Sequence, residues 1–197
     1  MVKISIAIPT HSMPNGDFFL KRLTDSLDRQ TFRDFEVVIT KEGKMAANTN
    51  AAIKRSKGEL IKILYMDDYL AHENALKTIV DAFKGNWLVT GCGHDNGDIW
   101  YNPHYPKWND QIYTGLNTIG SPSVLTMKND DPLLFDENLS WLLDCDLYQR
   151  LYDKYGQPTI LNDINVIIGV GEHQTTRTLS DEIKANEHNY LLNKYKI

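Results

Sequence analysis

Short apolar segments alternate with amphipathic segments along most of the chain. In residues 18–27, Leu23 and Leu27 recur with the period of a helix, whereas the β-branched run at residues 3–8 is typical of a buried strand and stops at Pro9. This alternation predicts a layered α/β fold. Strands are expected at residues 3–8, 35–40, 60–65, 87–92, 123–127 and 164–168, and the strand at residues 35–40 is interpreted as a second buried strand. Helices are expected at residues 18–27, 45–56, 73–83, 139–155 and 181–194.

Aromatic side chains gather in residues 93–117, among Gly, Asn, Pro and His residues. They are Trp100, Tyr101, Tyr105, Trp108 and Tyr113. We expect hairpins and loops in this segment, whose rings either stack on a sugar or anchor a hairpin over the core. No internal repeat or linker divides the chain, so a single domain is expected over residues 1–197.

The composition is that of a globular protein, with 197 residues of which 42% are hydrophobic. Lys and Arg number 21 against 26 Asp and Glu, and the net charge of -5 argues against a nucleic-acid binder, which needs a basic face. No apolar run approaches the roughly 20 residues of a membrane span, and the first residues show no signal-peptide pattern. Cys92 and Cys145 are too few for a disulfide framework, which predicts a cytoplasmic protein.

An acidic pair, Asp67 and Asp68, directly follows the strand expected at residues 60–65. Ligands of open α/β sheets bind beyond the carboxyl ends of the strands. Carboxylates there suit Mg²⁺ or Mn²⁺, hard cations that prefer oxygen ligands and complete their shell with phosphate oxygens. The pair is equally suited to the start of the following helix, where acidic side chains are favoured.

The sequence around this pair resembles that of the family-2 glycosyltransferases. Residues 45–70, MAANTNAAIKRSKGELIKILYMDDYL, resemble the family's ArNxGixxAxGeyIxfLDxDDxl stretch, which ends in the DXD motif. Residues 6–10 (IAIPT) resemble its opening siviPty, and residues 119–125 (IGSPSVL) its gpsxlf segment. Residues 135–151 contain FDENL and LDCDLYQRL, which resemble fdEnl and eDxdlwxRl. The pieces stand in the family's order and cover most of residues 3–151.

The resemblance implies a GT-A fold, a Rossmann-like three-layer α/β sandwich around a mixed, largely parallel sheet. It divides the single domain into a nucleotide-sugar-binding half at residues 1–92 and an acceptor and catalytic half at residues 93–178, followed by a C-terminal helix at residues 179–197. The partners implied are a nucleotide-sugar donor and a carbohydrate or other hydroxyl acceptor, and the oligomeric state stays open.

The implied reaction is an inverting, hexosyltransferase-type transfer from a nucleotide-diphosphate sugar to a hydroxyl, assisted by Mn²⁺ or Mg²⁺. Asp67 would hold the ion, with Asp68 as a second ligand or a contact to donor hydroxyls. Asp144 matches the family's general base, which takes the acceptor proton; the alternative for Asp144 is a solvated charge or a helix N-terminal contact. Asp146 lies about 200° further around the helix, so the two cannot point into one site.

The same resemblance implies further contacts to the nucleotide. Pro9 and Thr10 would lie near the base and ribose, although Pro9 is equally suited to ending the first strand. Asn50 would face the same crevice, with a surface Asn as the alternative. Glu42 would supply the one acid that remains of the family's vDDgS motif, which here reads Lys41-Glu42-Gly43.

His173, in a Gly-rich turn after the last strand, is a candidate metal ligand, because a late histidine often fills that role in GT-A enzymes; a plain loop residue is the alternative. Trp141, just before Asp144, is the expected acceptor-side ring. Arg150 is expected to be structural.

The chain departs from the family pattern in its first half. Tyr65 stands where the first Asp of DXD is expected, and a helix and a strand that normally precede the ArN helix are missing. The chain is therefore interpreted as a short variant that lacks part of the nucleotide-binding half. A catalytically degenerate nucleotide- or sugar-binding protein of the same fold is the competing hypothesis.

Overall fold

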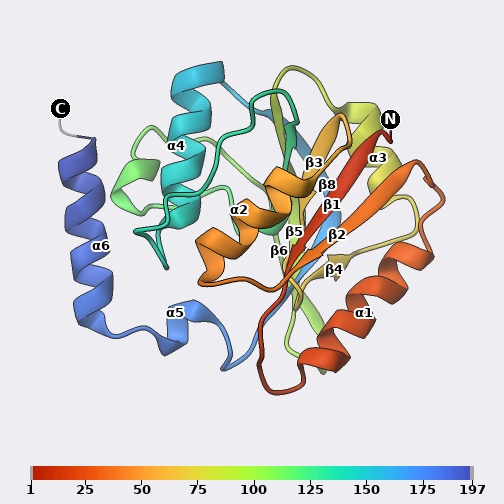
Figure 1. Ribbon diagram of the computed structural model, residues 1–197, viewed down its shortest axis with the longest axis horizontal. Helices are drawn as coiled ribbons and strands as arrows, with labels where there is room; N and C mark the ends of the chain where they lie inside the picture. The colour runs from red at the N-terminus through yellow and green to blue at the C-terminus, as the bar shows by residue number, and fades with distance from the viewer. Residues whose placement is uncertain (1, 196–197) are drawn as a thin grey trace.

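The computed structural model describes residues 2–195 and is organised around one eight-stranded sheet with helices on both sides (Figure 1). The strands are β1 (Ile4–Pro9), β2 (Phe35–Thr40), β3 (Leu60–Ile63), β4 (Tyr69–Leu70), β5 (Trp87–Asp95), β6 (Trp100–His104), β7 (Leu125–Lys128) and β8 (Thr159–Gly169). The α-helices are α1 (Gly16–Asp28), α2 (Met45–Arg55), α3 (Ala75–Ala82), α4 (Leu143–Tyr155), α5 (Thr175–Thr178) and α6 (Asp181–Lys194), and the 3-10 helices are η1 (Ile112–Thr114) and η2 (Pro122–Val124).

The sheet is mixed, with most of its strands pointing the same way. Its order is β2-β1-β3-β7-β5-β8-β4, and β6 pairs with β5 outside this path. β2, β1, β3, β5 and β8 run in one direction, while β4, β6 and β7 run antiparallel to their neighbours. The carboxyl ends of the parallel strands therefore meet at one edge, where the loops that carry candidate chemistry lie.

The hydrophobic pattern explains how the helices pack. In α1, Leu23 and Leu27 are buried, while Lys21 and Asp25 form an ion pair on the exposed face. α2 packs on β1 and β2, α3 packs on β8, and α1 lies against β4. The strand β1, which has a neighbour on each side, is buried along its whole length, as its β-branched sequence predicts.

The second strand differs from the prediction. β2 has the expected bounds, but it lies at the edge of the sheet, where Val37 and Ile39 are 42% and 47% exposed. The interpretation of residues 35–40 as a buried strand was therefore wrong, because an apolar run by itself does not distinguish an edge strand from a central one.

The start of α4 also differs from the prediction. The helix begins at Leu143 rather than at residue 139, because the preceding backbone is bound by another element. The Glu187 carboxylate of α6 accepts hydrogen bonds from the amides of Ser140, Trp141 and Leu142, at 2.7 to 2.9 Å. The terminal helix thereby fixes the segment that leads into α4.

Other bounds follow the sequence with smaller changes. The expected hairpin in residues 93–117 is β5–β6, and β8 begins at Thr159, five residues before the expected start at residue 164. The short helix α5 was not predicted. Among residues 2–195, no helix combines the length and the apolar character that crossing a membrane requires.

Replacing Glu187 with Ala is expected to lower the free energy of unfolding by about 1–3 kcal/mol, because three buried or half-buried amides lose their acceptor. Urea denaturation followed by circular dichroism measures the change. Replacing the exposed Glu73, whose side chain lies on the surface, is the matched control and is expected to change stability by no more than about 0.5 kcal/mol. Equal losses in the two variants would contradict the role given to Glu187.

Candidate functional site

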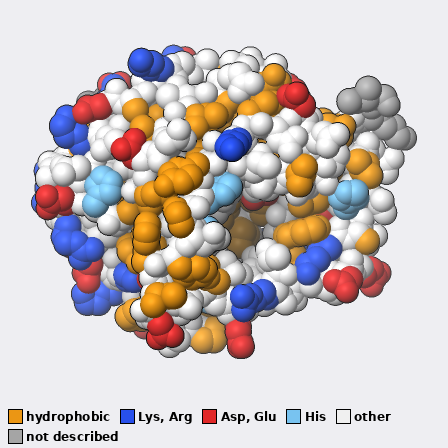
Figure 2. Space-filling model, turned by 180° about the vertical axis from the view of Figure 1, so that it is seen from behind, with side chains coloured by type: hydrophobic (Ala, Val, Ile, Leu, Met, Phe, Trp, Pro, Cys, Tyr) orange, Lys and Arg blue, Asp and Glu red, His pale blue; other side chains and the backbone are white. Residues whose placement is uncertain are grey.

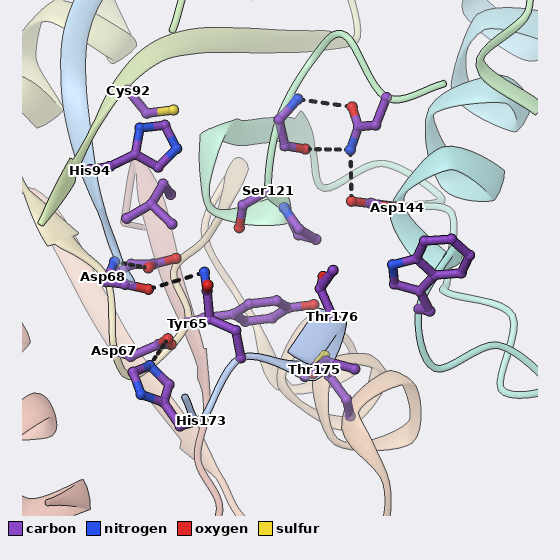
Figure 3. Close-up of a pocket in the computed structure, with 18 of the residues that line it drawn as sticks. Tyr65, Asp67, Asp68, Cys92, His94, Ser121, Asp144, His173, Thr175 and Thr176 are labelled. Atoms are coloured by element: carbon purple, nitrogen blue, oxygen red, sulfur yellow. Dashed lines mark hydrogen bonds and ion pairs between the residues drawn. The ribbon is translucent and has the colours of Figure 1, made fainter. Parts of the chain in front are cut away.

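A cavity of about 470 Å³ opens at the carboxyl edge of the parallel strands. Its wall includes five residues expected at the site, namely Asp67, Asp68, Trp141, Asp144 and His173. Figure 3 shows Asp67 and His173 on one wall and Asp144 on the opposite wall, with Tyr65 and Ser121 between them. The space-filling view in Figure 2 shows a hollow near the centre of the rear face, with histidine and hydrophobic side chains at its rim. Residues far apart in the chain thus surround one space.

Asp67 follows β3, and contacts to its main-chain carbonyl group fix its position. Its carbonyl oxygen accepts a hydrogen bond of 2.6 Å from Nη2 of Arg22, and Nη1 of Arg22 lies 2.9 Å from Oδ2 of Asp95 at the end of β5. Gly169 lies so close to this carbonyl that a Cβ atom there would collide with it. These contacts leave the Asp67 carboxylate directed to the cavity and to His173.

His173 brings a ring nitrogen to the Asp67 carboxylate. Its Nε2 lies 3.0 Å from Oδ2 of Asp67, and its ring packs against Phe19 with a centroid distance of 5.0 Å. Adjacent ligands of an octahedral cation at ~2.1 Å are roughly 3.0 Å apart, so the two atoms fit neighbouring positions around Mn²⁺ or Mg²⁺. Within residues 2–195 no three His, Cys, Asp or Glu side chains form a metal cluster, so the pair would need ligand oxygens to complete a shell.

Asp68 is buried and fulfils a structural role at the cavity wall. Its Oδ1 accepts a hydrogen bond of 2.8 Å from the amide of Gly169, at the end of β8. Burial, and then the charge of Asp67, raise the pKa of Asp68 well above its usual value. The ammonium of Lys62, also fully buried, favours the charged form and has its own pKa lowered by burial to about 7.

Asp144 lies in the first turn of α4 and has a defined donor for each carboxylate oxygen. Oδ1 accepts from the amide of Cys145 at 2.7 Å, and Oδ2 accepts from Nδ2 of Asn117 at 2.8 Å. Burial raises the pKa of Asp144 to about 6, against the opposing effect of these hydrogen bonds. The group is therefore mostly a carboxylate at neutral pH, and it is close to the point where it takes up a proton.

The neighbouring Asp146 points elsewhere, because residues two apart in a helix lie about 200° apart around its axis. It is fully buried, accepts hydrogen bonds from Nε and Nη2 of Arg150 and from the hydroxyl of Tyr195, and forms an ion pair with Lys194. Arg150 also donates to the carbonyl of Leu134, so its role is structural, as expected.

Asn117 is a site residue that the sequence analysis missed. Its Oδ1 accepts from the amides of Ile119 and Gly120, at 3.0 and 2.9 Å, so Nδ2 must face Asp144 and the Gly120 carbonyl. The signal available was an Asn just before the IGSPS turn, where Asn side chains commonly bind the backbone two residues on. No local pattern connects that turn with α4.

Two smaller cavities adjoin the main one. One of about 320 Å³ is lined by Pro9, Met45 and Met66 and shares Tyr65 and Asp67 with the main cavity. The other, of about 360 Å³, is lined by Thr10, whose hydroxyl donates to the carbonyl of Thr40 at 2.9 Å. Among the described residues, the Tyr65 hydroxyl is buried without a hydrogen-bond partner.

Two predicted nucleotide contacts lie outside these cavities. Asn50 is buried, and its Nδ2 donates hydrogen bonds to the Phe135 carbonyl and to the Glu137 carboxylate, while its Oδ1 accepts from the Phe135 amide. These bonds connect the segment before α4 to α2. Glu42 is exposed and paired with Arg55. We therefore remove Asn50 and Glu42 from the candidate site, because their polar groups have protein partners and do not line the cavities.

Trp141 lines the main cavity beside Asp144, and its amide is held by Glu187. The ammonium of Lys184 lies 5.9 Å from the centre of its ring. These contacts with α6 hold the Trp141 ring just before the N-terminus of α4, the helix that carries Asp144.

Comparison with known proteins places the fold. No protein-family model and no curated protein matches the chain. Three solved structures of S. aureus TarS match 98 to 99% of the chain. The structure of TarS matches with a TM-score of 0.67 and 19% sequence identity. For TarS residues 1–349, the complex with UDP-GlcNAc has a TM-score of 0.71 and the complex with UDP a TM-score of 0.65, each at 17% sequence identity. The chain spans 43% of the first of these chains, and 68% and 71% of the other two. The match confirms the predicted α/β fold of the glycosyltransferase, Rossmann-like type.

Replacing Asn117 with Ala is expected to raise the pKa of Asp144 above about 6, because a hydrogen bond that favours the carboxylate is lost. Asn117→Asp keeps an acceptor for the two backbone amides and is expected to raise the pKa further, because a second carboxylate faces the first. A pH titration of the Asp144 carboxyl ¹³C resonance measures both changes. Asn193→Ala on the exposed side of α6 is the control, and an unchanged or lower pKa in the Asn117 variants would contradict the assignment.

Proposed function

We propose that the protein is an inverting glycosyltransferase that moves a sugar from a nucleotide-diphosphate sugar to an acceptor hydroxyl. The observation that supports this most is the division of one cavity between the Asp67–His173 pair on one wall and Asp144 on the other. Such a transfer needs a site for the charged leaving group and, on the opposite side of the anomeric carbon, a base for the attacking hydroxyl.

The adjoining cavity suits the nucleoside part of the donor. Pro9, Met45 and Met66 offer apolar contacts to a flat base, and this cavity meets the main one at Tyr65 and Asp67. A diphosphate placed at the junction would lie beside Asp67 and His173. The complexes of TarS with UDP and UDP-GlcNAc support a nucleotide-sugar donor on this fold.

Asp67 and His173 would hold a Mn²⁺ or Mg²⁺ ion together with diphosphate oxygens. When bound, such an ion neutralises the charge that develops on the leaving nucleoside diphosphate. Arg22 and Gly169 keep the Asp67 carbonyl in place, so the carboxylate stays directed at the cavity. Phe19 restricts the ring of His173 in the same way.

Asp144 would act as the general base. The acceptor oxygen attacks the anomeric carbon, the bond from that carbon to the phosphate oxygen breaks, and the acceptor proton passes to Asp144. A pKa of about 6 gives a carboxylate at neutral pH that is more basic than an exposed Asp. Asn117 fixes the orientation of the carboxylate, and Trp141 offers a ring for an acceptor at the same wall.

Replacing Asp144 with Asn is expected to lower kcat about 10²–10⁴-fold, because a positioned base is lost. In the unchanged protein, kcat/KM is expected to rise with pH through about 6 and then level off, because only the deprotonated carboxylate accepts the proton. Nucleotide release from a panel of nucleotide sugars with Mn²⁺ measures both effects. The solvated Asp98→Asn is the control. UDP binding without turnover of any donor would favour the catalytically degenerate alternative.

Replacing Asp67 or His173 with Ala is expected to abolish the strengthening of UDP binding by Mn²⁺, because the ion loses one of two protein ligands. Isothermal titration of EDTA-treated protein with UDP, with and without Mn²⁺, measures the difference. Asp98→Ala is expected to retain the full effect of the ion. A Mn²⁺ effect of the same size in all variants would place the ion elsewhere.

A further inference from the structure

Two histidines with no part in the steps described above line the cavity from the β5–β6 hairpin. They are His94 on β5 and His104 on β6. His104 pairs across the hairpin with Cys92, which shares a strand face with His94. Figure 3 shows the His94 ring beside Cys92, on the same side of the cavity as Asp68 and opposite Asp144. The hairpin thus presents two imidazoles to the same space as Asp144.

The backbone decides which nitrogen of His94 carries hydrogen. Its Nδ1 lies 2.8 Å from the carbonyl oxygen of Asn102. A carbonyl oxygen can only accept, so Nδ1 must donate, and in the neutral ring Nε2 is then a bare acceptor.

Backbone carbonyl groups select the other neutral tautomer for His104. Its Nε2 lies 3.2 Å and 3.1 Å from the carbonyl oxygens of Thr118 and Ile119, so Nε2 donates and Nδ1 is bare. Within residues 2–195, neither bare nitrogen has a protein hydrogen-bond partner, and neither is sealed from solvent. The hairpin therefore offers two accepting atoms and no free imidazole donor.

We propose that His94 and His104 form a subsite for the hydroxyl groups of a polyhydroxyl ligand such as a saccharide. Two bare acceptors favour groups that donate hydrogen, and they disfavour phosphates and carboxylates, which only accept. Phosphate oxygens are expected instead at the Asp67–His173 wall, where a cation would lie between them and the protein.

The subsite belongs to the acceptor rather than to the donor. The His104 ring packs next to Gly120, and the Gly120 carbonyl accepts from the same Asn117 amide that holds Asp144. His104 is therefore connected to the general base through Gly120 and Asn117. This assignment to the acceptor rests on the proposed function, whereas the hydroxyl subsite rests on the two imidazoles alone.

Ring ¹⁵N spectra of the labelled protein above pH 7.5 test the subsite directly. The expected result is a bare Nε2 on His94 and a bare Nδ1 on His104. Adding methyl glycosides of glucose and N-acetylglucosamine in the presence of UDP is expected to shift these two resonances more than those of the exposed His72. A protonated Nε2 on His94, or shifts no larger than those of His72, would overturn the proposal.

Variants of His94 test the assignment to the acceptor. His94→Phe keeps the ring and removes the acceptor, so the ratio of transfer to donor hydrolysis is expected to fall about tenfold, as loss of one hydrogen bond implies. His94→Gln, which can place an amide oxygen near the former Nε2, is expected to recover most of that ratio. His72→Gln is the matched control. An equal fall in transfer and hydrolysis would overturn the assignment to the acceptor.

The two proposals fail differently. If the unchanged protein turns over no nucleotide sugar, the glycosyltransferase proposal fails, and the ring spectra still decide whether the histidines bind hydroxyl groups. If turnover is normal but the glycosides leave both imidazoles unaffected, the subsite fails and the proposed reaction stands.

Discussion

The hydrogen bond from the Gly169 amide to the buried Asp68 carboxylate is the contact on which the site depends. β3 and β8 are not neighbours in the sheet, so the chain after β3 must cross to reach β4, which pairs with β8. Asp68 fastens that crossing to the end of β8. Asp67 and His173, on the two fastened segments, then lie 3.0 Å apart although 106 residues separate them in sequence.

Buried charge is the second constraint, because each buried acid needs donors or an ion pair to offset its loss of hydration. Asp146 is neutralised by Arg150 and Lys194, which binds α4 to α6. Asp144 has only neutral donors, from Cys145 and Asn117, and burial raises its pKa. Two acids on one helix thus differ in chemistry because their neighbours differ. Asp146 is part of a structural ion pair, whereas Asp144 remains available to a ligand.

Features that depend on local pattern were predictable from the sequence. The bounds of α1, α2, β2 and α6 follow from periodicity and stop signals within about two residues. Features that depend on packing were not. Asn50 faces Phe135 rather than the cavity, because its side-chain amide exchanges hydrogen bonds with the backbone of that distant residue. β2 has an apolar sequence and still lies at the edge of the sheet, because the sequence of a strand does not show which strands will pair with it.

The sequence by itself determined the α/β class and the positions of acids after β3 and in α4, because hydrophobic periodicity and motif spacing are local properties. Only the tertiary structure decided which side chains share a cavity. It joined Asn117 to Asp144 and set the tautomers of His94 and His104 through carbonyl groups of other segments. The reason is physical: hydrogen-bond direction and burial are properties of the packed chain, and they fix the pKa and the donor or acceptor character that chemistry requires.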